Sequence, residues 1–466
     1  MRSQVPVAEL VSLLGHQWVR LNSRDLRSYA YDATGEKHPP DVVVFPSSTA
    51  EVAECVRLAG RHGLPVVPRG AGTNLSGGTT PLHGGMVINL VRMNRVLSVD
   101  PPARQAVVEA GATNLALQQA LTPHGLFFAP DPSSMRVSTI GGNVAENAGG
   151  LHCAKYGVTT NHVLGLTVVV SDGEVVRLGG RAEDVPGLDL LALFTGSEGT
   201  LGILTEAVLR ALPLPAATMT LLASFDDLTA CGAAVAGLVA ARVTPAALEL
   251  IDRETISTVR ASSAGAAGGY PEDAEAVLVI DVDGAAEDLP IEMERVEEVL
   301  RAHRVRVIRH ARDEAEREAL WSGRRSAWGS LARLSPSVWT TDVTVPRDRL
   351  VEMLERVMAL GVEHNLRVAT VAHAGDGNLH PTVPYDSRDP EERARVARLD
   401  AAIQSACVAL GGSITGEHGV GSEKLAGMEI MYGPDQLDLM WCVRRALDPD
   451  GRMNPGKAVP APKGGF

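Results

Sequence analysis

Cysteine is scarce in this sequence, and its few copies are scattered. Five cysteines occur among 466 residues, with no C-x-x-C pair and no cluster able to hold zinc or an iron–sulfur centre. We interpret all five as reduced thiols in a reducing compartment. They are Cys55, Cys153, Cys231, Cys407 and Cys442.

Long apolar runs and an excess of positive charge are also missing. No stretch of eighteen apolar residues occurs, and Gln, Pro and Glu interrupt the N-terminal segment before the apolar core of a signal peptide can form. Forty-three basic residues against 56 acidic ones leave a net charge of −13, which disfavours nucleic acid as a partner and polybasic attachment to a membrane. We expect a cytoplasmic protein, or one held at the inner face of the membrane by a partner.

The chain is long enough for two or three domains. Its length and its 45% of hydrophobic residues allow a large buried core, at about 150 residues per domain. Residues 41–70 have a strand–helix–strand pattern in which Ser48 and Glu51 form a capping box at the start of the helix. The segment Leu-Pro-Leu-Pro at 212–215 marks a domain boundary. No fixed-period repeat occurs, which excludes solenoids and propellers.

Glycine, in contrast, is abundant. The 47 glycines are concentrated in three runs, at residues 70–85, 141–150 and 196–202. Because glycine lets backbone amides face a ligand without a Cβ between them, these runs predict close approach of the backbone to a large ligand.

The first run follows a predicted strand and reads P-R-G-A-G-T-N-L-S-G-G from residue 68. Its successive amides and short hydroxyls suit a pyrophosphate. The spacing is not G-x-G-x-x-G, because Leu75 takes the place of the third glycine, and no lysine follows Gly77 or Gly78 as a P-loop requires. A glycine-rich hairpin loop is the alternative for this segment alone.

Two further loops, at residues 139–150 and 195–203, are hard to explain as simple turns. Together the three segments resemble the FAD domain of the vanillyl-alcohol oxidase and p-cresol methylhydroxylase superfamily. The resemblance implies that the pyrophosphate lies at residues 69–77 and that the flavin ring lies near the second loop. The implied FAD-binding residues are Arg69, Gly70, Ala71, Gly72, Thr73, Asn74, Ser76, Gly77, Pro132, Ser138, Thr139, Gly142, Asn143, Asn147, Gly149, Glu198, Gly202, Ile203 and Asn454.

Some members of that superfamily attach the flavin covalently to a histidine near the second loop. His152 is the only nearby candidate here. The branch that this chain matches usually lacks the bond, so we expect non-covalent FAD. A histidine that lines the fold is then the ordinary interpretation of His152.

A second constellation is H-A-G-D-G-N-L-H at residues 373–380. If Asp376-Gly377 forms a two-residue hairpin turn, His373 lies directly opposite His380, with Cβ atoms about 5 Å apart on one face. This geometry suits one divalent ion, with zinc, manganese, iron and cobalt all acceptable. Glu417 is the candidate carboxylate ligand.

Glu417 and His418 are sequence neighbours, so on a regular strand their side chains would face opposite ways. Gly416, Gly419 and Gly421 permit an irregular backbone, which leaves His418 available as a general base. From the residues alone, the alternative is a turn flanked by two surface histidines and an unrelated Glu–His pair.

Residues 372–457 resemble the FAD-linked subunit of glycolate oxidase and its D-lactate dehydrogenase relatives. The matching motifs are H-A-G-D-G-N-L-H-P from residue 373, G-G-S-I-T-G-E-H-G-V-G from residue 411 and D-P-D-G-R-M-N-P-G-K from residue 448. With the FAD segments, the resemblance spans nearly the whole chain. It implies a divalent metal, zinc or manganese being favoured, on His373, His380 and Glu417. It also implies that His418 takes a proton, that Asn378 contacts the substrate and that Asn454 reaches the flavin.

A third constellation is an arginine inside an apolar stripe, which needs an anion as partner. A substrate carboxylate meets that need through a bidentate contact, and the family resemblance assigns this role to Arg324. The alternative is a structural ion pair with an acid at a domain interface, which we prefer for Arg325. The stripe on one face of the predicted helix comprises Leu320, Trp321, Arg324, Trp328 and Leu331.

One departure from the relatives bears on the substrate. Those that oxidise 2-hydroxyglutarate have a lysine in the strand that matches residues 338–342, where this chain has threonines. A second substrate carboxylate is therefore poorly matched, which favours glycolate, D-lactate or another monocarboxylate.

We expect an FAD-dependent, metal-assisted dehydrogenase that oxidises a small D-2-hydroxy acid to the 2-oxo acid. Its electrons would pass to a non-NAD acceptor, such as an iron–sulfur or quinone-linked partner. The alternatives are a D-2-hydroxyglutarate-type dehydrogenase, a metal-dependent hydrolase and a non-catalytic electron-transfer subunit.

The expected fold class is α+β. Residues 1–212 would form a two-part FAD-binding domain of the vanillyl-alcohol oxidase type, and residues 213–424 an α+β cap domain with an antiparallel sheet that carries the substrate and metal sites. Residues 425–466 would return to the FAD-binding domain. The sequence leaves the oligomeric state open, with a homodimer as one option.

Overall fold

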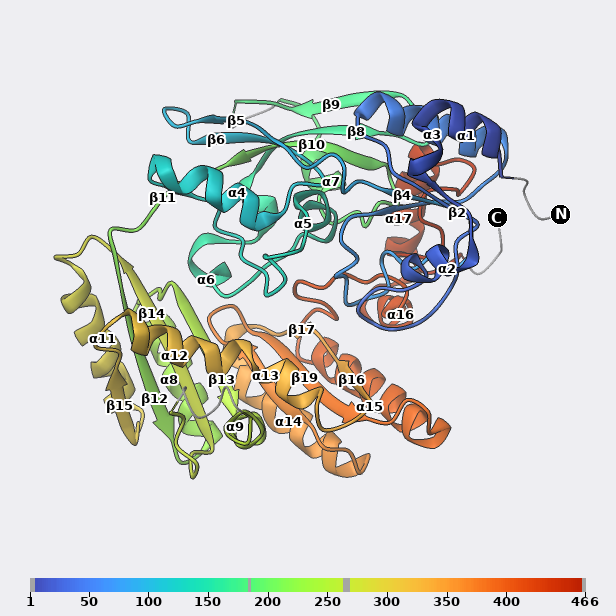
Figure 1. Cartoon of the computed structure of the whole chain (residues 1–466). Helices are drawn as coiled ribbons and strands as arrows, with labels where there is room; N and C mark the ends of the chain where they lie inside the picture. The colour runs from blue at the N-terminus through green and yellow to red at the C-terminus, as the bar shows by residue number, and fades with distance from the viewer. Residues whose placement is uncertain (1–4, 183–185, 263–268, 463–466) are drawn as a thin grey trace. The chain divides into compact units, whose positions relative to one another are not determined.

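A computed structural model describes residues 5–182, 186–262 and 269–462 of the chain (Figure 1). By its internal contacts the chain divides into two compact units. Unit 1 comprises residues 1–149, 158–214 and 417–466, and unit 2 comprises residues 150–157 and 215–416. The chain thus enters the main part of unit 2 at residue 215 and returns to unit 1 at residue 417.

Unit 1 contains two main sheets. In the first, with strand order β1-β2-β4-β3, β2 and β3 run parallel to β4. The second is antiparallel, with order β5-β6-β10-β8-β9, and β7 pairs separately with β11. The strands are β1 Val19–Arg20, β2 Val42–Val44, β3 Val66–Arg69, β4 Met86–Asn89, β5 Val96–Asp100, β6 Gln105–Glu109, β7 Leu126–Phe127, β8 Val163–Val169, β9 Val175–Gly179, β10 Ile203–Arg210 and β11 Leu212–Pro213.

The helices of unit 1 pack beside these sheets. They are α1 Val7–Leu14, α2 Ser23–Leu26, α3 Thr49–Arg61, α4 Asn114–Leu121, α5 Ile140–Glu146, α7 Leu190–Phe194, α16 Leu425–Met431 and α17 Pro434–Leu447, with short 3-10 helices at His16–Trp18, Arg27–Tyr29, Thr122–His124 and Thr159–His162.

The predicted strand–helix–strand segment is confirmed. Ser48 is the N-cap of α3, and its side chain accepts a hydrogen bond from Glu51 N at 3.2 Å. The Glu51 carboxylate reaches back to the N–H of Ser47, one residue before the cap, at 2.7 Å. The buried residues of α3, which include Val52 and Val56, cover the first sheet. This packing fixes the direction in which β3 delivers the first glycine-rich loop.

The C-terminal segment belongs to the first sheet of unit 1. Val66 N donates to Arg452 O at 2.9 Å, and Asn454 N donates to Val66 O at 2.7 Å. Arg444 of α17 is buried, and its guanidinium donates to the carbonyl oxygens of Lys457 and Met453. The end of the chain is therefore bonded to the strand that leads into the glycine-rich loop.

Unit 2 is built on one antiparallel sheet of order β15-β12-β14-β13-β18-β19-β16, with β17 also paired to β19. Alternate residues of its strands are buried on opposite faces: Leu278 and Ile280 of β14 belong to one core cluster, and Val277 and Val279 to another. The strands are β12 Ala217–Phe225, β13 Ala247–Asp252, β14 Ala276–Gly284, β15 Val307–His310, β16 Ser337–Thr340, β17 Val343–Thr344, β18 Ala369–His373 and β19 Asn378–Tyr385.

Helices cover both faces of this sheet. On the larger core, α14 and α15 lie side by side, and α8 packs against α11 and α14 (Figure 1). The helices are α6 Cys153–Tyr156, α8 Leu228–Ala240, α9 Arg253–Arg260, α11 Leu289–Ala302, α12 Glu314–Arg325, α13 Ala327–Leu331, α14 Leu350–Glu363 and α15 Pro390–Ala409, with a 3-10 turn at Arg347–Arg349. Among the helices described, none is long and apolar enough to cross a lipid bilayer.

Candidate active site

The first glycine-rich segment forms a tight loop after β3. Asn74 Oδ1 accepts hydrogen bonds from Ser76 N at 2.9 Å and from Gly78 N at 2.7 Å, so this side chain closes the loop on itself. A Cβ added to Gly70 would lie 2.2 Å from Thr139 Oγ1 of the second loop. The missing side chain of Gly70 therefore lets Thr139 of the second loop approach the backbone of the first loop closely.

A pocket lies in unit 1 where these loops meet. The residues predicted to bind FAD divide into two groups here. The cavity is lined by Arg69, Gly70, Thr139, Gly142, Glu198, Gly202 and Ile203. Those that do not line it are Ala71, Gly72, Thr73, Asn74, Ser76, Gly77, Pro132, Ser138, Asn143, Asn147, Gly149 and Asn454.

Two buried polar atoms in residues adjacent to the pocket lining indicate that the pocket binds a polar ligand. Ser138 Oγ and Asn143 Nδ2 are buried, and neither has a hydrogen-bond partner among the residues that the structure describes. Buried polar atoms are normally satisfied, so a bound group with its own donors and acceptors would complete them. The open glycine cradle and these two atoms fit FAD.

The segment from Glu417 to Glu423 packs against the same loops. Glu198 accepts hydrogen bonds from Val420 N and Gly421 N, both at 2.7 Å, and Ser76 Oγ donates to His418 O at 2.9 Å. Gly421 has a φ of +52°, and a Cβ on it would lie 1.9 Å from Ser76 O. Glycine is therefore required at position 421 for two reasons: the positive φ, and the close approach of this residue to the backbone of the first glycine-rich loop.

Ionisable side chains are buried beside the cavity. Burial raises the pKa of Glu146 well above its ordinary value, and the nearby carboxylates of Glu198 and Asp32 raise it further. Burial also raises the pKa of Glu198, although the hydrogen bonds from Val420 N and Gly421 N oppose this rise. Burial lowers the pKa of Lys457 to about 8, and its Nζ donates to Gly77 O at 2.5 Å.

Sequence reasoning missed Glu146 and Lys457 as parts of this environment. Glu146 lines the cavity, and its signal was a carboxylate inside an otherwise uncharged, glycine-rich segment. Asn454, which was predicted to reach the flavin, is buried and donates from Nδ2 to Gly78 O at 2.8 Å and to Glu198 O at 2.6 Å. It joins the C-terminal segment to two of the glycine-rich loops, and its contact with flavin stays a prediction.

The predicted register of the histidine hairpin is wrong in unit 2. His373 is paired with Asn378, and His380 is paired with Val371, because the turn contains four residues rather than two. Gly377 N bonds back to His373 O at 3.1 Å, which closes this longer turn. The shift moves the histidines from opposite to diagonal positions but keeps them on one face, since side chains alternate with a period of two. Their ring centroids are 5.0 Å apart.

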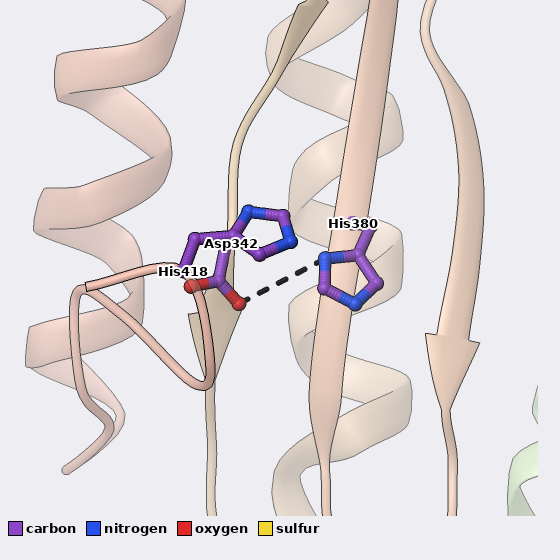
Figure 2. Close-up of side chains that lie close together, drawn as sticks. All are labelled: Asp342, His380 and His418. Atoms are coloured by element: carbon purple, nitrogen blue, oxygen red, sulfur yellow. Dashed lines mark ion pairs between the residues drawn. The ribbon is translucent and has the colours of Figure 1, made fainter. Parts of the chain in front are cut away.

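Asp342 is a residue of this site that sequence reasoning did not single out. Its Oδ1 lies 3.8 Å from His380 Nδ1, an ion pair that Figure 2 shows as a dashed line. Its Oδ2 accepts hydrogen bonds from Thr415 Oγ1 at 2.6 Å and from Gly416 N at 2.9 Å. This buried carboxylate therefore joins His380 to the end of the segment that precedes Glu417.

Arg324 is held by a buried carboxylate that was also missed. Its Nε donates to Glu249 Oε2 at 2.7 Å, and Glu249 Oε1 lies 2.6 Å from His373 Nδ1. Burial raises the pKa of Glu249, but the charges of His373 and Arg324 outweigh this effect, and the pKa is lowered. The structural ion pair considered for Arg324 thus exists, while its Nη1 and Nη2 make no hydrogen bond within the described ranges.

The single helix predicted over residues 320–331 is interrupted. The helix α12 ends at Arg325 and α13 begins at Ala327, and Trp328 is 48% exposed instead of continuing the buried stripe. The α12 segment is docked by Trp321, whose Nε1 donates to Asp281. Arg325 makes the ion pair that we preferred for it, but its partner is Glu318, an exposed residue of the same helix and not an acid at a domain interface.

The remaining predicted residues lie as follows. Asn378 is buried, and its Nδ2 donates to Asp342 Oδ1 at 2.7 Å and to Val343 O at 3.0 Å, so its contact with substrate stays a prediction. His152 groups with unit 2, where its ring lies beside Tyr156. Glu417 and His418 group with unit 1, with His418 Nε2 3.9 Å from Glu417 Oε1.

Comparison with known proteins matches both parts of the chain. Residues 40–179 match the family described as FAD binding domain, and residues 214–458 match the family described as FAD linked oxidases, C-terminal domain. The glycolate oxidase subunit GlcD of Escherichia coli K12 is 45% identical over 90% of this chain and 84% of its own length. The D-lactate dehydrogenase of Anaerostipes hadrus is 34% identical over 90% of both chains.

Solved structures share the fold. A p-cresol methylhydroxylase superposes with a TM-score of 0.81 at 18% identity, covering 97% of this chain and 96% of that one. A 4-ethylphenol oxidase from Gulosibacter chungangensis gives a TM-score of 0.80 at 19% identity, covering 98% and 97%. The predicted α+β fold with an FAD-binding domain of this type is thereby confirmed. The chain belongs to the family of FAD-linked oxidases.

Proposed function

We propose that the protein oxidises a small D-2-hydroxy acid, of the glycolate or D-lactate type, to the 2-oxo acid. Relatives named glycolate oxidase subunit and D-lactate dehydrogenase match about nine tenths of the chain, which supports this substrate class. Because one of them is named as a subunit, we further propose that the electrons leave through a partner protein rather than through NAD.

The observation that carries the proposal is the position of Arg324. Its guanidinium and the His373 imidazole bind the two oxygens of one buried carboxylate, Glu249. Only Nε is used in this contact, so the terminal nitrogens are left to bind a carboxylate as a fork. A substrate carboxylate held there would keep its α-hydroxyl near the histidine pair.

His373 and His380 fit a divalent metal. Glu249 binds His373 Nδ1 and so orients this ring, and the centroids of the two imidazole rings lie 5.0 Å apart. Asp342 accepts a hydrogen bond from the backbone N–H of Gly416. Glu417 is the next residue, so its Cα lies about 3.8 Å from that of Gly416 across a trans peptide. We propose that His373, His380 and Glu417 hold the ion. When bound, such an ion lowers the pKa of a coordinated hydroxyl.

In this proposal His418 accepts the hydroxyl proton of the substrate. Its backbone carbonyl accepts a hydrogen bond from Ser76 Oγ, and Glu198 accepts hydrogen bonds from the N–H groups of Val420 and Gly421. These bonds hold the loop that carries the imidazole. Arg324 orients the substrate through the carboxylate, and the surrounding residues exclude water. Bound FAD supplies the acceptor for the hydride released from Cα.

Substrate preference tests the proposal directly. The strand β16 and the following Thr341 offer threonines, and Thr341 Oγ1 donates to Asp400 at 2.6 Å, so this strand supplies no cation for a second carboxylate. We expect glycolate or D-lactate to be oxidised with a kcat/KM at least about 10-fold above that of D-2-hydroxyglutarate, because a bidentate ion pair would be missing for the latter. A dye-coupled assay of D- and L-2-hydroxy acids measures this, and a preference for the dicarboxylate would contradict it.

Metal removal gives a second test. We expect dialysis against a chelator to abolish oxidation of every substrate while the yellow flavin absorbance stays with the protein, because the metal ligands are not the cradle residues. Zinc or manganese added back in stoichiometric amounts should restore turnover. Full activity in metal-free protein, verified by elemental analysis, would remove the ion from the proposal while leaving the flavin chemistry intact.

A further inference from the structure

We infer that Glu249 is a positioning residue that orients Arg324 and His373 together, so that substrate binding and metal binding both depend on one carboxylate. The inference rests on the proposed function and extends it to a residue that touches neither the substrate nor the ion.

The first support is the strand register. Glu249 of β13 is directly opposite His373 of β18 in an antiparallel pair, so the two side chains share a face with their Cβ atoms about 5 Å apart. At this spacing the carboxylate reaches the near ring nitrogen, and the observed distance to Nδ1 is 2.6 Å. A carboxylate that binds Nδ1 selects the tautomer in which Nε2 carries a lone pair for an ion.

The second support is how α12 brings Arg324 to the other oxygen. Trp321 Nε1 donates to Asp281 at 3.0 Å, and Tyr270 OH donates to Leu320 O at 2.7 Å, so the helix is fixed just before the arginine. A Cβ on Gly323 would lie 2.7 Å from the Tyr270 ring, so glycine allows this close packing. The guanidinium is thereby directed to Glu249 through Nε.

The third support is that the shared carboxylate is fully buried. Glu249 has no solvent-exposed surface, while Arg324 and His373 retain 8% and 6%. Burying a group of charged side chains costs free energy of folding. Replacing such a group by apolar side chains of similar size often leaves the fold equally stable or more stable. A group of this kind is therefore poorly explained by stability alone, whereas orienting two side chains that must act together explains it.

Glu249→Gln is the central test. Glutamine keeps the volume but replaces one of the two acceptor oxygens by an NH₂ donor, so the partner that faces this nitrogen loses its acceptor. We expect metal affinity, measured by calorimetry on the FAD-loaded protein, to fall about 10- to 100-fold. We also expect the dissociation constant of oxalate, an unreactive dicarboxylate followed through the flavin spectrum, to rise by at least about 10-fold when it is measured on metal-free protein, where chelation of the ion does not contribute. Unchanged values for both ligands overturn the inference.

Asp252→Asn is the matched control. Asp252 is a buried acid on the same strand, and it accepts hydrogen bonds from Thr255 N and Thr370 N without touching Arg324 or His373. We expect this variant to melt earlier while keeping the wild-type metal and oxalate affinities. If it loses both affinities as Glu249→Gln does, the effect is a general one of removing a buried charge, and the inference fails.

Glu249→Asp covers the case in which the glutamine variant does not fold. The shorter carboxylate keeps both acceptors but cannot reach both partners, so metal and oxalate affinities should again fall, and unchanged affinities overturn the inference. The wild-type protein separates the two proposals. If it binds no metal and oxidises no 2-hydroxy acid, the proposed function fails; if it does both and the Glu249 variants match it, only the inference fails.

Discussion

His418→Ala is expected to lower kcat by about 10²- to 10⁴-fold while FAD content stays near the wild-type level. The reason is that the substitution removes the proposed proton acceptor, whose contribution is of this size in other enzymes, but leaves the backbone of its loop anchored. Ser76 Oγ bonds to the carbonyl oxygen of His418, and Glu198 binds the amides of Val420 and Gly421. None of these contacts uses the imidazole.

Steady-state turnover and the flavin-to-protein absorbance ratio measure the two quantities separately. Added imidazole should restore part of the turnover, since a free base can enter the space left by the side chain. His124→Ala, at an exposed position on a short 3-10 helix, is the control and should keep full activity. An equal loss of turnover and of FAD would show that His418 is structural.

Gly421→Ala is expected to destabilise unit 1 and to release FAD. The added Cβ would lie 1.9 Å from Ser76 O, and that oxygen also accepts hydrogen bonds from Ser422 N at 2.9 Å and Glu423 N at 3.2 Å. Backbone atoms cannot move aside as a flexible side chain can. The left-handed conformation costs roughly 1 kcal/mol and overpacking roughly 1–3 kcal/mol more, so the loop should separate from the cradle.

Gly411→Ala isolates the conformational part of this effect. Gly411 has a φ of +78°, but an added Cβ would meet nothing within 4 Å. We expect Gly411→Ala to lower the melting temperature slightly and to keep FAD. Gly421→Ala should lower it several degrees further and lose FAD on gel filtration. Equal melting temperatures and equal FAD retention in the two variants would mean that the close approach of residue 421 to Ser76 does not affect stability.

Local sequence signals predicted the elements that depend on neighbouring residues. Ser48 and Glu51 set the start of α3, and the glycine runs identified the loops that line the cavity. The histidine register failed because an Asp-Gly pair was taken as a complete two-residue turn. The preceding Ala374 and Gly375 are also part of the turn, which no short-range rule excludes.

The partners that orient the site could not be found in the same way. Glu249 lies 75 residues from Arg324 and 124 residues from His373, and it sits in the run A-L-E-L-I-D, which has the appearance of an ordinary buried strand. Asp342 similarly follows two threonines, which we considered only because they take the place of a lysine that would bind a second substrate carboxylate. Such pairs are set by the order of strands in a sheet, and a single sequence contains no direct record of that order.

The bonds between Val66 and the segment at Arg452–Asn454 have a consequence for biosynthesis. Unit 1 combines segments that come before and after unit 2, with about two hundred residues of unit 2 inserted between them. A nascent chain that has emerged only as far as residue 214 lacks the partner for the strand that leads into its glycine-rich loop. We therefore expect the strand before the first glycine-rich loop to gain its last partner only after residues 452–454 have been synthesised.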